Sequence, residues 1–155
     1  MFAAQLAAIE HVRPGVTFVS VHERALAVLG DGLARLGLCA GSGAEVLANE
    51  SYKRFYMHRT SHWLGLDVHD CGAYLAGGSS RALEPGMVLT VEPGLYVAPD
   101  DTTVDARWRG IGVRIEDDVL VTATGCDVLT EMIPKSVDEV EAACRGRQLV
   151  PSVHG

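Results

Sequence analysis

Two β-branched segments in the second half of the chain constrain its fold more than any other feature. They are GMVLTVEPGLYV at residues 86–97 and GIGVRIEDDVLVT at residues 110–122. Both are rich in Val or Ile and are bounded by Gly or Pro, a pattern typical of β-strands. We therefore expect this region to form a sheet and the remaining elements to pack on one of its faces.

Segments with helical spacing of apolar residues come before these strands. One covers residues 2–12, and Ser20 is placed to cap a second that ends near residue 38. A third helix is predicted over roughly residues 43–56, and a short last helix is predicted after its cap, Ser136. Because the helices precede the strands and do not alternate with them, the order favours an α+β fold over repeated βαβ units.

The composition excludes several classes of protein. With 155 residues, 48% of them apolar, the chain can bury one core, so we expect one domain or a large piece of one. The net charge is −7 and no stripe of Lys and Arg is present, which argues against a nucleic-acid partner. There is no run of about 18 apolar residues and no basic N-terminal region, so neither a membrane span nor a signal peptide is predicted. A cytoplasmic protein is the expectation.

Charged residues within the strand segments are the first candidates for chemistry. Glu92 is the only charged residue in MVLTVEPGLYV, and an ionised carboxylate in an apolar run is costly unless it is paired or binds metal. It could equally cap the following turn or face water. In the second segment, Arg114, Glu116 and Asp118 share one face at period two, although a solvated face of mixed charge is the usual explanation for one strand.

Three histidines crowd the stretch YMHRTSHWLGLDVHD, at positions 58, 62 and 69. His58 and His62 have the spacing of a helical zinc-protease motif, but its glutamate is missing and Gly65 disfavours a helix. On an extended segment these two histidines share a face, and His69 joins them only if a turn near LGLD re-aims it. The other three histidines, at positions 11, 22 and 154, are interpreted as ordinary hydrogen-bonded side chains.

One imidazole with two or more carboxylates predicts a particular kind of metal site. Such ligands suit manganese, cobalt or zinc, and a high share of oxygen ligands favours manganese. Two such ions can hold a hydroxide at neutral pH and polarise a carbonyl group. Nearby histidines that do not bind metal could stabilise an oxyanion or position the substrate. Hydrolysis of an acyl or peptide bond is the chemistry that this set of residues would serve.

Several separated motifs carry a resemblance to a known family. The segments HRTSHWLGLDVHD, VLTVEPGLYV and WRGIGVRIEDDVLVT, in this order and spacing, closely resemble the bacterial Xaa-Pro aminopeptidases of the pita-bread metallopeptidase family. The resemblance implies an α+β fold, the C-terminal half of a pita-bread domain, with helices packed on a curved, mostly antiparallel sheet. It also implies three metal ligands, which are His62, Glu92 and Glu116.

The same resemblance assigns roles in catalysis. It implies that His58 and His69 contact the substrate, that Arg114 supports the site, and that Glu92 is also the candidate proton shuttle. The implied reaction is attack of a metal-bound hydroxide on the carbonyl between an N-terminal residue and a following proline. Two Mn²⁺ ions, or alternatively Co²⁺ or Zn²⁺, are expected in the complete enzyme. A prolidase that cleaves dipeptides, and a catalytically silent module that binds peptides or another protein, are the alternatives.

The chain also departs from the family pattern. Family members carry two aspartate ligands and a further histidine in a preceding half of the catalytic domain, and the aspartates at positions 67, 70, 105, 117 and 118 do not match them. Asp70 is expected to orient a histidine, and Asp118 to pair with Arg114. Residues 1–155 are therefore expected to be the C-terminal part of a catalytic domain, with the N-terminal domain and first catalytic half absent. The isolated chain would be impaired or inactive, would bind metal weakly or at one site, and would form homo-oligomers or need the missing half.

Overall fold

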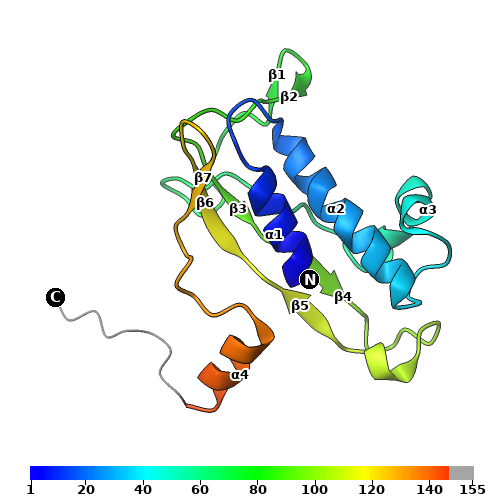
Figure 1. The fold of residues 1–155 in the computed structure, drawn as a ribbon. Helices are drawn as coiled ribbons and strands as arrows, with labels where there is room; N and C mark the ends of the chain where they lie inside the picture. Colours follow the sequence, from blue (N-terminus) through cyan, green and yellow to red (C-terminus); the bar gives the residue numbers. More distant parts are fainter. Residues whose placement is uncertain (147–155) are drawn as a thin grey trace.

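The computed structural model describes residues 1–146 and consists of helices packed against short antiparallel strands (Figure 1). The N-terminal helices α1 (Phe2–His11) and α2 (Phe18–Arg35) lie side by side over the sheet. The predicted first helix is confirmed to within one residue. The second begins earlier than predicted, because Thr17 is its N-cap and Ser20 lies in its first turn, where the Ser20 hydroxyl donates to the Thr17 carbonyl at 2.7 Å.

The prediction of one helix over residues 43–56 is wrong. Helix α3 (Gly43–Ala48) begins at a capping box formed by Ser42 and Glu45, and a separate 3₁₀ turn, η1 (Ser51–Arg54), follows it. Between the two, Glu50 adopts a left-handed conformation with φ of 57°. A helix cannot continue through such a residue, so the apolar periodicity extends beyond the helix that it predicts.

The sheet is built from one long antiparallel pair of segments that is interrupted in the middle. The first segment contains β3 (Val88–Val91) and β4 (Gly94–Tyr96), and the second contains β5 (Gly112–Arg114) and β6 (Asp117–Val121). Strand β3 pairs with β6, and β4 pairs with β5. Val91 pairs with Asp117 and Gly94 with Arg114, so the two interruptions lie opposite each other. Each predicted strand segment is therefore divided at the position of a glutamate.

Shorter elements complete the described part of the chain. Strand β7 (Cys126–Val128) pairs with β6, and the hairpin of β1 (Leu75–Ala76) and β2 (Ser79–Ser80) projects from the body (Figure 1). The 3₁₀ turn η2 (Ala106–Trp108) precedes β5. Helix α4 (Val137–Cys144) begins at the predicted cap, Ser136, whose side chain accepts from the backbone N–H of Glu139. No helix in residues 1–146 combines the length and the apolar character that crossing a bilayer requires.

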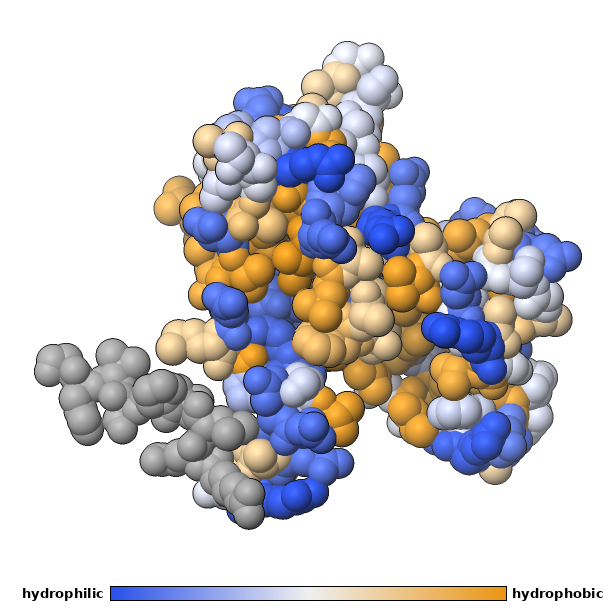
Figure 2. Space-filling view, in the orientation of Figure 1, coloured by the Kyte–Doolittle hydropathy of each residue, from blue (hydrophilic) through white to orange (hydrophobic). Residues whose placement is uncertain are grey.

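The main core lies between the two N-terminal helices and the sheet. Val21 and Ala25 of α2 are fully buried there against Leu89 of β3 and Val119 of β6. Figure 2 shows that apolar residues also gather on the surface of the face that carries α1, where Leu6 is 49% exposed. This packing holds β3 and β6 against α2.

Candidate metal centre

Three side chains from separate segments meet at the interruption in the sheet. His62 lies on an extended segment beside β3, Glu92 directly follows β3, and Glu116 directly precedes β6. One nitrogen or oxygen atom from each lies within 4.8 Å of the corresponding atoms of the other two. Glu92 is buried, His62 is partly buried and Glu116 is exposed. One imidazole and two carboxylates in this space suit a divalent cation such as manganese, cobalt or zinc.

The hydrogen bonds of His62 leave its Nε2 lone pair facing Glu92. Nδ1 of His62 lies 3.0 Å from the carbonyl oxygen of Trp63, which can only accept, so Nδ1 carries the proton of the neutral ring. In that neutral ring Nε2 carries a lone pair, and it lies 3.1 Å from Oε1 of Glu92. Two acceptors at that distance repel each other unless a proton or a cation lies between them. A ligating imidazole whose other nitrogen donates to a carbonyl is usual in metal sites, so these residues fit a bound divalent ion.

Both carboxylates also interact with other charged or polar groups. Glu92 accepts from the Thr90 hydroxyl at 3.3 Å, and its Oε2 lies 3.7 Å from Nη1 of Arg114. Burial raises the pKa of Glu116, and the negative charges of Glu92 and Asp118 raise it further. A cation would relieve this repulsion. Within residues 1–146 no hydrogen bond or ion pair joins Arg114 to Asp118, so that predicted pair is wrong: Arg114 turns to Glu92 instead.

A chain of hydrogen bonds fixes His58 beside the carboxylates. Nε of Arg114 donates to the hydroxyl of Tyr96 at 2.7 Å, and a hydrogen bond of 3.0 Å joins that hydroxyl to Nε2 of His58. Nδ1 of His58 lies 2.8 Å from the Arg59 carbonyl oxygen, which can only accept, so Nδ1 is the donor of this bond. Tyr96 was not among the predicted site residues, because a tyrosine in a strand resembles any core aromatic until its strand partner is known.

A turn brings His69 to the other side of the site. The His62 and His69 rings lie edge to face with centroids 4.4 Å apart. Gly65 permits this turn, since a Cβ there would lie only 1.9 Å from Oδ2 of Asp70. The Asp70 backbone N–H donates to the Trp63 carbonyl at 3.1 Å. Its side chain makes no hydrogen bond to a histidine in the described part of the chain, so the predicted orienting role of Asp70 is wrong.

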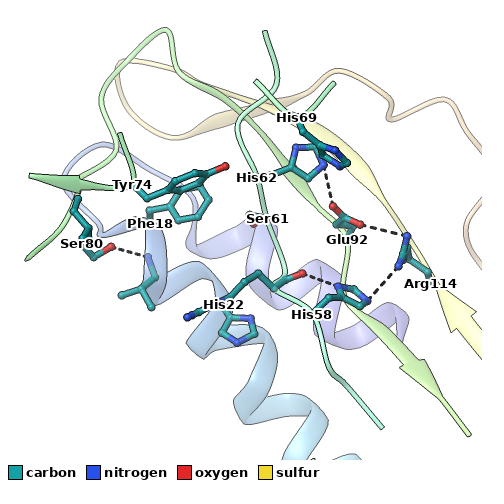
Figure 3. Close-up of a pocket in the computed structure, with 13 residues that line it drawn as sticks. Phe18, His22, His58, Ser61, His62, His69, Tyr74, Ser80, Glu92 and Arg114 are labelled. Carbon is teal, nitrogen blue, oxygen red and sulfur yellow. Dashed lines mark hydrogen bonds and ion pairs between the residues drawn. The ribbon is translucent and has the colours of Figure 1, made fainter. Parts of the chain in front are cut away.

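The site opens into a cavity of about 780 Å³. Figure 3 shows Glu92 between the His62–His69 pair and the Arg114–His58 pair, all at one end of this cavity. The aromatic side chains of Phe18 and Tyr74 lie at the other end, and Val19 and Leu75 also line the cavity. A concave, largely apolar space with a few convergent polar groups is typical of a small-ligand or peptide site.

His22 of α2 lies on the wall of the same cavity, although nothing in the sequence singled it out. Its Nδ1 lies 2.8 Å from the Thr60 hydroxyl. Burial lowers the pKa of His22 to about 4, and the positive charges of Arg59 and His58 contribute. His11, by contrast, makes an ordinary hydrogen bond to a serine on α2. His154 lies outside the described residues.

The depressed pKa of His22 predicts a loss of stability in mild acid. Above pH 6.5 the ring is neutral in both folded and unfolded chains, but below it the unfolded chain takes up a proton that the folded chain resists until the pH nears 4. After allowance for solvent at a partly buried ring, we expect the free energy of unfolding to fall by about 2 kcal/mol across this window. Urea denaturation at pH 7 and pH 4.5 should show a smaller fall in His22→Asn. Identical falls in both proteins would contradict the assignment.

The sequence of this chain is similar to that of known metallopeptidases. The model of metallopeptidase family M24 matches residues 1–123. The chain is 49% identical over 130 residues to Xaa-Pro aminopeptidase of Escherichia coli, covering 84% of this chain and 29% of that protein. It is 47% identical over 154 residues to Xaa-Pro aminopeptidase 1 of Streptomyces coelicolor, covering 94% of this chain and 30% of the relative.

The fold of this chain is also similar to that of solved aminopeptidase structures. The fold matches aminopeptidase PepP of Pseudomonas aeruginosa with a TM-score of 0.91 at 55% identity, over 94% of this chain and 33% of that one. Aminopeptidase P of E. coli with the inhibitor Pro-Leu gives a TM-score of 0.87 at 44% identity. The predicted α+β pita-bread architecture is thereby confirmed. The chain spans about a third of the length of the proteins that it matches.

Proposed function

This chain belongs to metallopeptidase family M24, and we propose that it supplies metal-binding and substrate-contacting residues to an aminopeptidase that removes an N-terminal residue preceding proline. The observation that carries this proposal is the cluster of His62, Glu92 and Glu116, in which Nε2 of His62 lies 3.1 Å from a carboxylate oxygen of Glu92. The names of the relatives support the choice of substrate, because they act on Xaa-Pro bonds.

Manganese is the proposed ion, with cobalt or zinc as alternatives, and the cytoplasm is the proposed location. A divalent ion in this site would polarise the scissile carbonyl and lower the pKa of bound water to about 7. Three protein ligands do not fill the coordination shell of such an ion, which predicts weak binding or a single site in this chain alone. We propose that residues 1–155 are the C-terminal part of the catalytic domain and that other ligands come from outside it, in line with the one-third coverage of relatives.

The polar residues of the site also have roles toward the substrate, either by contacting it or by holding a residue that does. Oε2 of Glu92, held 3.7 Å from Arg114, is placed to take a proton and pass it to the proline nitrogen as the bond breaks. His69, beside His62, would donate to the oxygen on which negative charge develops. His58 lies on the opposite side of Glu92, where it would contact the peptide around the scissile bond. Arg114 keeps the His58 ring in place through the Tyr96 hydroxyl.

A peptide-cleavage assay tests this function. The purified chain with added Mn²⁺ is expected to release the N-terminal residue from an Xaa-Pro-Xaa tripeptide, slowly compared with the full-length E. coli relative measured beside it. An Xaa-Ala-Xaa tripeptide should be cleaved at least about tenfold more slowly, since the site would discriminate by the residue after the scissile bond. His62→Ala should abolish the reaction.

Other outcomes would select the alternatives. Cleavage of an Xaa-Pro dipeptide but not of the tripeptide would identify a prolidase. A folded chain that binds Mn²⁺ and the tripeptide without cleaving it, both alone and with a polypeptide that supplies the missing ligands, would identify a silent peptide-binding module. If folded chain bound no Mn²⁺ at all, the metal-centre proposal would have to be abandoned.

A further inference from the structure

Thr60 joins helix α2 to the strand that carries Glu92. Thr60 is fully buried, and its carbonyl accepts the backbone N–H of Glu92 at 2.7 Å. Its backbone N–H donates to Nδ1 of His22 at 3.2 Å, and its hydroxyl lies 2.8 Å from the same nitrogen. A hydrogen bond of 2.6 Å joins that hydroxyl to the hydroxyl of Tyr56. The polar groups of Thr60 are therefore divided between a helix on one side and the metal-binding strand on the other.

The segment that begins at Thr60 runs antiparallel to β3 and delivers His62 to the site. The carbonyl of His62 accepts the backbone N–H of Thr90 at 3.0 Å, and its own N–H donates to the Thr90 hydroxyl at 3.1 Å. Trp63 forms a bridge with Leu89 one residue further on. A slip of one residue in this pairing would turn the His62 ring to the opposite face, away from Glu92. The position of Thr60 therefore sets the position of the imidazole.

On the side of Thr60 that faces away from β3, His22 is the hydrogen-bond partner of the backbone N–H. A backbone N–H can only donate, so Nδ1 of His22 must be unprotonated and the neutral ring carries its proton on Nε2. Burial of the ring favours this neutral form. Without an acceptor at this point, the N–H of Thr60 would be buried and unpaired, which costs free energy. The segment could avoid that cost only by shifting its position.

We propose that His22 is a positioning residue of the metal centre: by accepting from Thr60, it fixes the segment from Thr60 to His62 against β3 and so sets the separation between His62 and Glu92. This inference rests on the proposed function, because it assumes that these two residues bind the metal. His22 itself makes no hydrogen bond or ion pair with either of them in residues 1–146.

The test compares two replacements of His22 by the Mn²⁺ dissociation constant of the purified chain, measured by isothermal titration calorimetry. His22→Leu has a similar volume and no acceptor, whereas the side-chain oxygen of His22→Asn can occupy the place of Nδ1. We expect His22→Leu to weaken Mn²⁺ binding about tenfold, the effect typical of losing a group that orients a ligand. His22→Asn should stay within about twofold of the wild type, because it keeps the acceptor.

A control separates positioning from general loss of stability. Val46 is fully buried in a different cluster, with Leu33 and Phe55, so Val46→Ala should lower the unfolding midpoint and leave the dissociation constant unchanged. If His22→Leu does not fold, His22→Phe carries the test, since it keeps a planar ring and removes the acceptor of the Thr60 N–H. It is then expected to weaken Mn²⁺ binding while Val46→Ala does not.

The outcomes distinguish this inference from the proposed function. Wild-type affinity in His22→Leu, or in His22→Phe if the leucine variant does not fold, would overturn the positioning role provided that His62→Ala still abolishes binding. The positioning role is also overturned if Val46→Ala weakens binding as much as His22→Leu does. If His62→Ala leaves Mn²⁺ affinity unchanged, the metal centre itself is wrong and the positioning role is lost with it.

Discussion

Replacing Glu92 by alanine is expected to raise the dissociation constant for Mn²⁺ by about a hundredfold or more. Loss of a residue that only orients a metal ligand typically costs about tenfold to a hundredfold, and Glu92 is a proposed ligand itself. Glu92 lies at the centre of the site, with Oε1 3.1 Å from His62 and Oε2 3.7 Å from Arg114. Its removal leaves one imidazole and one exposed carboxylate facing the guanidinium of Arg114. Two ligands beside a positive guanidinium hold a cation weakly, and residues 1–146 offer no other group of three candidate ligands.

Calorimetric titration of wild type, Glu92→Ala and Glu84→Ala with MnCl₂ measures this effect. Glu84 is an exposed glutamate between β2 and β3, eight positions before Glu92. In the described part of the chain its only ion pair is a surface contact with Arg81. Glu84→Ala should bind Mn²⁺ like the wild type. Circular dichroism must show that both variants are folded. Equal affinities in all three proteins would place the metal site elsewhere.

Replacing Lys135 by methionine is expected to lower the free energy of unfolding by about 3 kcal/mol, because it leaves a buried carboxylate without its counter-charge. Asp117 is 3% exposed, and Nζ of Lys135 lies 2.9 Å from its Oδ1. The same ammonium donates to the carbonyl oxygens of Thr130 and Ile133 at 2.7 and 2.9 Å, which fixes the segment between β7 and α4. Asp117 also accepts from Gln5 of α1.

Urea denaturation at pH 7 measures this loss. Lys53→Met is the matched control, since the Lys53 ammonium forms an exposed ion pair with Glu50, and such pairs contribute no more than about 1 kcal/mol. Adding Asp117→Asn to Lys135→Met should recover part of the stability, because the uncompensated charge is then gone. A loss in Lys135→Met no larger than that in Lys53→Met would show that the buried pair is not a principal source of stability.

Features set by neighbouring residues were predicted well. Ser136 and Glu139 form the capping box of α4, and both partners lie within four residues of each other. Helix α1 follows its own apolar spacing and ends within one residue of its predicted boundary. Elements whose ends depend on a single backbone conformation were predicted poorly. The left-handed conformation of Glu50, a residue with no strong preference for it, ended a helix that the periodicity extended to residue 56.

The two strand segments show the same limit. Period-two alternation put Arg114, Glu116 and Asp118 on one face, but it did not tell which face is buried, and Val113 on the opposite face is 43% exposed. The carboxylate of Asp117 is buried on that side instead, because Lys135 reaches it from a segment 18 positions away in the chain. Alternation predicts which residues share a face, but it does not predict which face packs against another element.

The sequence by itself determined the kinds of elements, their order and the chemical types of the candidate ligands, because these depend on local spacing and on side-chain chemistry. The tertiary structure alone decided that the interruptions of two paired strands lie opposite each other, which brings Glu92 and Glu116 to one place. It also decided that Tyr96 fixes the ring of His58 and that His22 accepts from Thr60. Each of these contacts joins two residues that are 38 positions apart in the chain. A local sequence pattern cannot predict them, because the packing of the folded chain determines which polar groups become hydrogen-bond partners.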